Sequence, residues 1–321
     1  MSNPIAKHVE LLTPKRRWTQ FFLGTLLVLG TVCQEFARPS GVCAQSQDSD
    51  DDDQPSTEVS KEASPEKANL HRLLDEAAGQ YSMFAGPDAT EPLKLRCVLR
   101  WANQIRGSVD GATYIWTDRG RPVATVCCYP WYDVICDNFQ SLGRTPIRAE
   151  RDDKIAWQPQ TAGVEFQRVP DAPAPGDTAT ARLRQMKTLA RGFRTTLLGW
   201  APGDPDREEL RLLPQPVYRY ECGPEPELLD GSLFAFVQGT DPEALLMLEA
   251  VPAESDEEQY EWQFALGRRT SGWLEVRYRD QVVWKAAKDP EWRDPKSTYF
   301  QLSHPLPPTD VPGKKGKNLQ K

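Results

Sequence analysis

Cysteine is the residue type in this chain with the clearest potential for chemistry. Five cysteines lie beyond the first 44 residues: Cys97, Cys127, Cys128, Cys136 and Cys222. Five is an odd number, so at least one thiol has no partner within the chain. Cys127 and Cys128 are adjacent in an expected strand and therefore face opposite sides. Cys136 follows a proline turn and is within reach of either one, so we expect a Cys128–Cys136 disulfide. Buried free thiols that act as small apolar side chains are the alternative.

Other catalytic constellations are missing from the sequence. Beyond the first 44 residues there are two histidines, His71 and His304, too few and too peripheral for a zinc site or a Ser-His-Asp triad. The sequence contains no GxSxG, HExxH, P-loop or CxxC motif. We therefore predict no catalytic, metal-binding or cofactor-binding residue, and whether the chain is an enzyme stays open, with the balance against. Carboxylates are plentiful, so a two-carboxylate glycosidase remains an alternative.

Tryptophan is the other residue type that suggests a site. Trp101, Trp116 and Trp131 surround one expected hairpin. Exposed tryptophans on a sheet stack on sugar rings or form protein contacts. We predict this group as an aromatic contact surface, with core filling as the alternative for each ring.

These side chains depend on a hairpin at 111–131, GATYIWTDRGRPVATVCCYPW. Its first arm is rich in β-branched and aromatic residues, Asp118-Arg119-Gly120 makes the turn, and Pro130 ends the return strand. Apolar residues at helical spacing predict a helix over 68–81 before it, and residues 93–101 alternate like a central strand. This first half covers residues 68–170.

The second half, residues 171–304, begins in a proline-rich connector. Asp177 or Thr178 caps a predicted helix that runs to Gly192. Strands at about ten-residue spacing with turn residues between them follow. The fold class is therefore α+β, mostly antiparallel β-sheet with an N-terminal helix and one mid-chain helix, and the two halves are expected to pack together.

The N-terminus has the composition of an export signal. Lys15-Arg16-Arg17 precedes a short apolar run, and Val42 and Ala44 supply small residues before Gln45. We predict a signal peptide over 1–44, cleaved between Ala44 and Gln45; an uncleaved signal-anchor is the alternative. The Asp-rich residues 45–67 and the Pro/Lys-rich residues 305–321 are expected to be disordered.

Several stretches of the chain carry a resemblance. They are the RRWTQFFLGTLLVL leader and the segments LRWANQIRG, GATYIWTDRGRPVA, PGDTATARLRQMKTLARGF and GSLFAFVQGTDPEALLMLEA. The chain resembles an uncharacterised family of exported bacterial proteins with no assigned activity. The resemblance implies export and supplies no catalytic residue.

Together these features predict an exported protein of the periplasm or cell envelope. With a net charge of −7, the chain has no electrostatic pattern that favours nucleic acid, and the basic face of the helix expected before Gly192 is interpreted as a solvated face. We expect a non-catalytic module that binds a protein or glycan of the envelope, without a cofactor, and that meets the membrane only through an uncleaved N-terminus. A carboxylate-dependent envelope hydrolase acting on glycans is the alternative.

Overall fold

The computed structural model describes residues 64–105, 109–199, 207–220, 228–254 and 256–306. The expected leader, the Ala44–Gln45 cleavage site, most of the acidic linker and most of the tail lie outside these ranges, as does Cys222. Within them, no helix is both long and apolar enough to cross a bilayer.

Two helices and an array of antiparallel strands confirm the predicted fold class. Helix α1 is Pro65–Gly79 and helix α2 is Ala179–Ala190. Ser64 and Thr178 cap them, each accepting a hydrogen bond from the backbone N–H three residues on, as N-cap residues do. Pro65–Lys67, expected in the disordered linker, therefore form the first turn of α1, because the Ser-Pro pair is a helix start.

The first large sheet has five strands in the order β17-β5-β4-β3-β2. Their bounds are Tyr299–Pro305, Val134–Ser141, Arg121–Trp131, Val109–Asp118 and Lys94–Asn103. A smaller sheet has the order β1-β6-β7. Its strands are Ser82–Phe84, Arg148–Arg151 and Lys154–Trp157.

The second large sheet follows the order β16-β15-β9-β10-β12-β13-β14-β8, and β11 also pairs with β12. In that order the strands are Gln281–Ala286, Leu274–Tyr278, Phe193–Leu197, Glu208–Leu212, Asp230–Gln238, Asp241–Ala253, Asp256–Arg268 and Gln167–Arg168, with β11 at Tyr218–Arg219.

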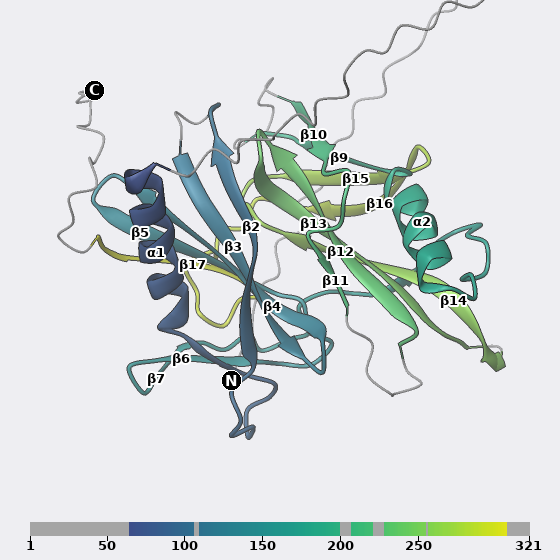
Figure 1. Ribbon diagram of the computed structural model, residues 1–321, viewed down its shortest axis with the longest axis horizontal. Coiled ribbons are helices and arrows are strands. Elements are labelled where there is room, and N and C mark those ends of the chain that lie inside the picture. Colours follow the sequence, from purple (N-terminus) through teal and green to yellow (C-terminus); the bar gives the residue numbers. More distant parts are fainter. Residues whose placement is uncertain (1–63, 106–108, 200–206, 221–227, 255, 307–321) are drawn as a thin grey trace, which may run out of the picture. The chain divides into compact units, whose positions relative to one another are not determined.

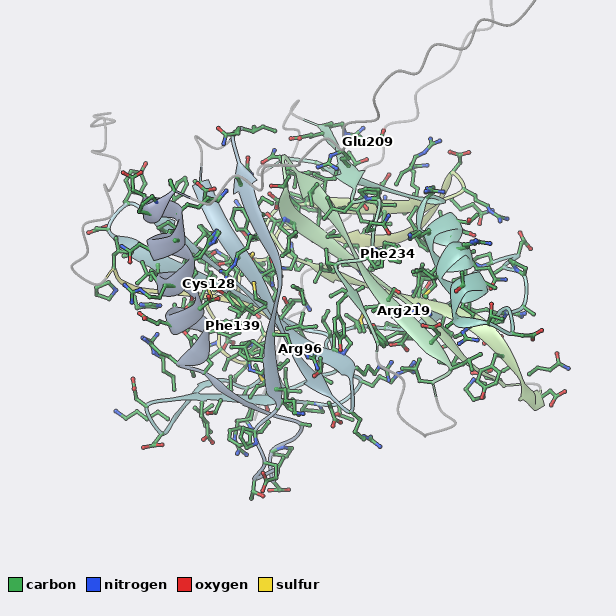
Figure 2. The ribbon with its side chains drawn as sticks, viewed as in Figure 1. Arg96, Cys128, Phe139, Glu209, Arg219 and Phe234 are labelled. Carbon is green, nitrogen blue, oxygen red and sulfur yellow. The ribbon has the colours of Figure 1, made fainter. Side chains whose placement is uncertain are left out.

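These elements form four layers: helix, sheet, sheet, helix (Figure 1). One face of the first sheet packs under α1, where Cys128 and Phe139 lie (Figure 2). One face of the second sheet packs under α2 through residues such as Phe234 and Phe236. The two remaining faces meet each other through Ile115, Leu233 and Met247, among others. Because side chains alternate along a strand, β3 and β12 are apolar on both faces.

The two halves of the fold are structural repeats. In the hairpin β3–β4, Trp116 pairs with Ala124 and Thr117 with Pro122, with a register shift between Trp116 and Thr117. In β12–β13, the residues 120 positions further on, Phe236 with Ala244 and Val237 with Pro242, repeat this pairing and this shift.

A second hairpin repeats in the same way. The register shift of β6–β7 falls between Ala149 and Glu150, and that of β15–β16 falls 127 positions later, between Val276 and Arg277. Both hairpins turn through two residues of positive φ, Asp152-Asp153 and Arg279-Asp280. Apart from the short β11, the order of elements, the registers and the irregularities correspond in the two halves, which indicates an internal duplication.

The repeats also exchange their last strands. Strand β8 follows the first repeat in sequence but pairs with β14 of the second. Strand β17 follows the second repeat but pairs with β5 of the first. Reciprocal exchange of an edge strand is the arrangement of a domain-swapped dimer, here within one chain.

Two local expectations were wrong. Residues 93–101 do not form a central strand, since β2 lies at the edge of its sheet with β3 as its partner among the described strands. Pro305, expected in the disordered tail, is the last residue of β17. Non-local pairing with the other repeat forms β17, and no local pattern encodes such pairing.

Candidate functional site

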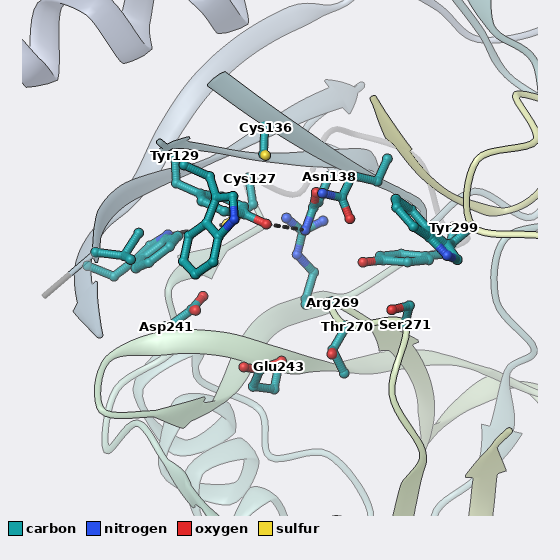
Figure 3. Close-up of a pocket in the computed structure, with 15 residues that line it drawn as sticks. Cys127, Tyr129, Cys136, Asn138, Asp241, Glu243, Arg269, Thr270, Ser271 and Tyr299 are labelled. Carbon is teal, nitrogen blue, oxygen red and sulfur yellow. Dashed lines mark hydrogen bonds between the residues drawn. The ribbon is translucent and has the colours of Figure 1, made fainter. Parts of the chain in front are cut away.

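A pocket of about 250 Å³ lies between the two large sheets. The first repeat contributes side chains of β2, β4 and β5 and the first residue of β3. The second contributes the start of β13 and the residues that follow β14 (Figure 3). The segment before β17 and the start of β17 add Trp292, Tyr299 and Gln301. Both repeats therefore build the pocket, which lies where side chains do not fill the space between their facing sheets.

Aromatic rings form the wall on the side of the first sheet. The rings of Trp101 and Tyr129 lie 5.8 Å apart, tilted by 55°. The indole N–H of Trp101 donates to the Cys127 sulfur at 3.2 Å, and the Thr113 hydroxyl lies 3.3 Å from the same sulfur. These contacts hold the ring of Trp101, which is 4% exposed, in one position.

Arg269 is the central charged group of the site. It directly follows β14 and is 3% exposed, with its backbone N–H bonded to the carbonyl of Glu243 at 2.8 Å. Its side chain points between the sheets towards Asn138 and Tyr129 (Figure 3). None of its three guanidinium nitrogens has an oxygen or nitrogen hydrogen-bond partner within the described residues, and the Cys127 thiol beside it is a weak acceptor.

The positive charge of Arg269 affects the pKa values of two neighbouring side chains, Tyr299 and Cys127. Burial raises the pKa of the Tyr299 phenol, and the nearby positive charge of Arg269 opposes this rise while Glu243 adds to it. Burial also raises the pKa of the Cys127 thiol, again against Arg269. A thiol is a weak acceptor and does not replace the oxygen partners that a guanidinium requires.

Polar side chains complete the lining. Asn138 is 7% exposed, and its amide nitrogen lies 3.5 Å from the Tyr129 hydroxyl. Its amide oxygen has no hydrogen-bond partner in the described chain. Asp241, Glu243, Thr270 and Ser271 line the opposite side (Figure 3). The pocket thus combines buried donors and a buried acceptor with carboxylates and aromatic rings.

The expected Cys128–Cys136 disulfide is absent. Cys128 and Cys136 are both free thiols, as are Cys97 and Cys127. In the ladder, Cys128 lies opposite Asp137 and Cys136 lies opposite Tyr129, so the two side chains leave opposite faces of the sheet. Cys136 lines the pocket, whereas Cys128 packs under α1.

The predicted aromatic group is divided between the two faces of the same sheet. Trp101 and Trp131 line the pocket, and Trp131 is 40% exposed. Trp116 is 1% exposed and packs under α1, stacked on Phe139 at 6.2 Å. Its expected role in an aromatic contact surface is therefore wrong, because the odd–even alternation of β3 directs it into the core.

An equivalent place at the other end of the fold is closed by an ion-pair cluster. Glu249 is buried and accepts from the Arg121 Nε and Nη2 atoms at 2.9 and 2.6 Å and from Arg144 Nη2 at 3.4 Å. The residues that correspond to these three in the other repeat are Tyr129, Asp241 and Ser271, and all line the pocket. Duplication has therefore produced one end filled by a carboxylate and one end that stays open.

No sequence pattern predicts Arg269 as a residue of this site. Arg269 lies in the turn Arg268-Arg269-Thr270, which reads as an ordinary solvated turn. Arg268 beside it donates to the carbonyls of Thr270, Gly272 and Ala287 at 2.7–2.8 Å. Arg268 and Arg269 look alike in the sequence. Only the packing of the two repeats shows that Arg268 is hydrogen-bonded and that Arg269 faces the pocket.

Neither a metal site nor a similar known protein indicates what this pocket does. In the ranges that the structure describes, no group of three or more His, Cys, Asp or Glu side chains is arranged to hold a metal ion. Comparisons with protein-family models, with curated proteins and with solved structures found no match. The class of the protein is therefore defined by its fold alone: a duplicated helix–sheet–sheet–helix protein with a pocket between its sheets.

Proposed function

We propose that this chain is an exported, non-catalytic binding module of the cell envelope, and that its inter-sheet pocket holds a small polar ligand. The observation that carries this proposal is the buried guanidinium of Arg269, which has no oxygen or nitrogen hydrogen-bond partner among the described residues and faces a cavity lined by aromatic rings. Concave sites with aromatic walls and a few convergent polar groups are typical ligand sites. The basic, then apolar, then small-residue order of the N-terminus supports export.

The chemistry of the lining supports binding over covalent catalysis. A nucleophilic cysteine requires a thiol pKa lowered by its surroundings. Burial instead raises the pKa of both pocket thiols, Cys127 and Cys136. No histidine is among the described residues that line the pocket, since His71 lies on α1 and His304 contacts Asp137.

A full-length chain titrated with envelope glycan fragments, peptides and small metabolites tests the proposal. Because Trp101, Trp131 and Trp292 line the pocket, ligand binding should change the intrinsic tryptophan fluorescence and raise the unfolding temperature. Ser271→Trp, which fills the pocket, should abolish both responses. Thr188→Trp, on the exposed side of α2, should retain them. Equal responses in the two variants would contradict binding at this pocket.

A glycan hydrolase is the second candidate, because Asp241 and Glu243 both line the pocket. Two carboxylates on either side of a glycosidic bond are the machinery of most glycosidases. Incubation of the chain with envelope glycans separates the two functions. Release of new reducing ends that is lost in Glu243→Gln would establish the hydrolase, whereas binding without product supports the binding module.

A further inference from the structure

We propose that the ligand of the inter-sheet pocket is a small monocarboxylate that also carries a hydroxyl or amine, and that Arg269 binds its carboxylate. This inference rests on the proposed function and specifies the ligand class. The guanidinium of Arg269 is buried, and no oxygen or nitrogen acceptor among the described residues pairs with it. A buried charge without a partner is strongly unfavourable, and a bound anion would supply that partner.

The guanidinium defines the first group of the ligand. Its three nitrogens carry five N–H donors in a plane, which match the two oxygens of a carboxylate as a pair of parallel hydrogen bonds. The chain contains this geometry at its other end, where Arg121 holds the Glu249 carboxylate through two nitrogens. An external carboxylate at Arg269 would complete the open end as Glu249 completes the closed one.

The charges around the pocket favour a carboxylate over a phosphate. Asp241 and Glu243 line the same cavity as Arg269. Like charges repel, so a phosphate group with nearly two negative charges is less favourable beside these carboxylates than a carboxylate with one negative charge. A single negative charge, with a neutral or positive group towards Asp241 and Glu243, suits this set of side chains.

Asn138 defines the second group of the ligand. Its amide oxygen is a buried acceptor without a partner in the described chain, and Arg269 points towards this side chain (Figure 3). A hydroxyl or ammonium donor close to the carboxylate would bond this oxygen while the carboxylate bonds Arg269. The rings of Trp101 and Tyr129 then cover the apolar part of the ligand, as aromatic walls of ligand pockets do.

The experiment uses the full-length chain and matched probes, measured by calorimetry and by unfolding temperature at constant ionic strength. The probes are lactate, alanine and glucuronate, with propylene glycol, alaninamide and glucose as partners that lack the carboxylate, and inorganic phosphate. We expect carboxylate probes to bind about tenfold or more tightly than their partners and than phosphate. Arg269→Met should remove this difference, and Arg194→Met, an exposed arginine on β9, should keep it.

A second measurement needs no ligand. Arg269→Met should raise the unfolding temperature of the ligand-free chain, because it removes a buried charge without partners. Arg268→Met should lower it, because Arg268 donates to three carbonyls. A lower unfolding temperature for Arg269→Met would overturn the inference, since the guanidinium would then be paired in the folded chain.

The binding outcomes separate this inference from the proposed function. Binding of glucose or alaninamide as tight as that of their carboxylate partners would preserve a binding module and overturn the carboxylate assignment. Tighter binding of phosphate than of any carboxylate would do the same. No response to any probe, together with equal behaviour of Ser271→Trp and the unaltered chain, would overturn both.

Discussion

Gly111 and Gly231 have the same role in the two repeats: each lies beneath an aromatic ring of the neighbouring strand or loop. A Cβ on Gly111 would lie 2.3 Å from Cζ2 of Trp101, and a Cβ on Gly231 would lie 2.2 Å from Cδ2 of Tyr220. Trp101 is a wall of the open pocket, and burial raises the pKa of Tyr220 beside Glu249 at the closed end. One glycine in each repeat therefore sets the position of a ring between the sheets.

Gly111→Ala and Gly231→Ala should both destabilise the chain. Each added methyl group overlaps a buried ring, and overpacking of this kind costs about 1–3 kcal/mol. Urea unfolding monitored by circular dichroism measures the loss. Gly111→Ala should also weaken ligand binding at the pocket, because it displaces Trp101, whereas Gly231→Ala should not.

Gly79 provides the control for these substitutions. It is the last residue of α1, and a Cβ there would meet no atom within 4 Å. Gly79→Ala should leave stability unchanged or raise it by up to about 1 kcal/mol, because alanine favours the helix. If all three substitutions had equal effects, close packing of the rings would not be their cause.

The helices and hairpins were predictable because short-range signals define them. Thr178 begins α2 and the Asp118-Arg119-Gly120 turn closes β3–β4, and in both cases the determining residues lie within a few positions of each other. The same holds for the fold class, since turn residues recur between apolar runs.

The strand order and the site could not be predicted in this way. Strand β17 pairs with β5 across more than 150 positions of sequence, and no local pattern reports such a partner. The repeats correspond in their strand registers and register shifts, which become visible only in the folded chain. Arg269 became a site residue only because the faces of two repeats meet around it.

All four described cysteines should be alkylated without prior reduction once the chain is denatured. In the native chain Cys97 should react first, because it is exposed and the other three are buried. Peptide mass spectrometry after alkylation measures both results. A peptide pair linked through Cys128 and Cys136 would contradict the free thiols, and Cys136→Ser, which cannot form that link, is the matched control.

The predicted signal peptide implies a defined mature N-terminus. N-terminal sequencing of the protein from cell fractions should begin at Gln45, because Val42 and Ala44 place small residues at the positions that a signal peptidase recognises. Ala44→Glu should block cleavage and leave the longer chain. Recovery of intact Met1 in the cytoplasm would contradict export.

The carboxyl group of Glu249 should make the folding stability of the chain decrease as the pH rises, whereas a carboxyl group with a lowered pKa has the opposite effect. Burial raises its pKa above the usual 4.5, and the charges of Arg121 and Arg144 oppose this rise without cancelling it. A folded-state pKa above the unfolded value means that the folded chain holds the proton more tightly. The stabilising contribution is then fully present below about pH 4.5 and is lost as the pH rises through the folded pKa.

Glu249→Gln removes this titration, and Glu275→Gln provides a control of opposite sign. Hydrogen bonds from Lys285 and Arg277 lower the pKa of Glu275, so its contribution is present at neutral pH and lost on acidification. Urea unfolding between pH 4 and pH 8 measures both effects. As the pH rises, the stability of the unaltered chain should fall relative to that of Glu249→Gln. Over the same range it should rise relative to that of Glu275→Gln. If the stability of the unaltered chain instead rose relative to that of Glu249→Gln with rising pH, the effect of the two arginines on the pKa of Glu249 would exceed the effect of burial. The ion-pair cluster of the closed end would then stabilise the chain at neutral pH.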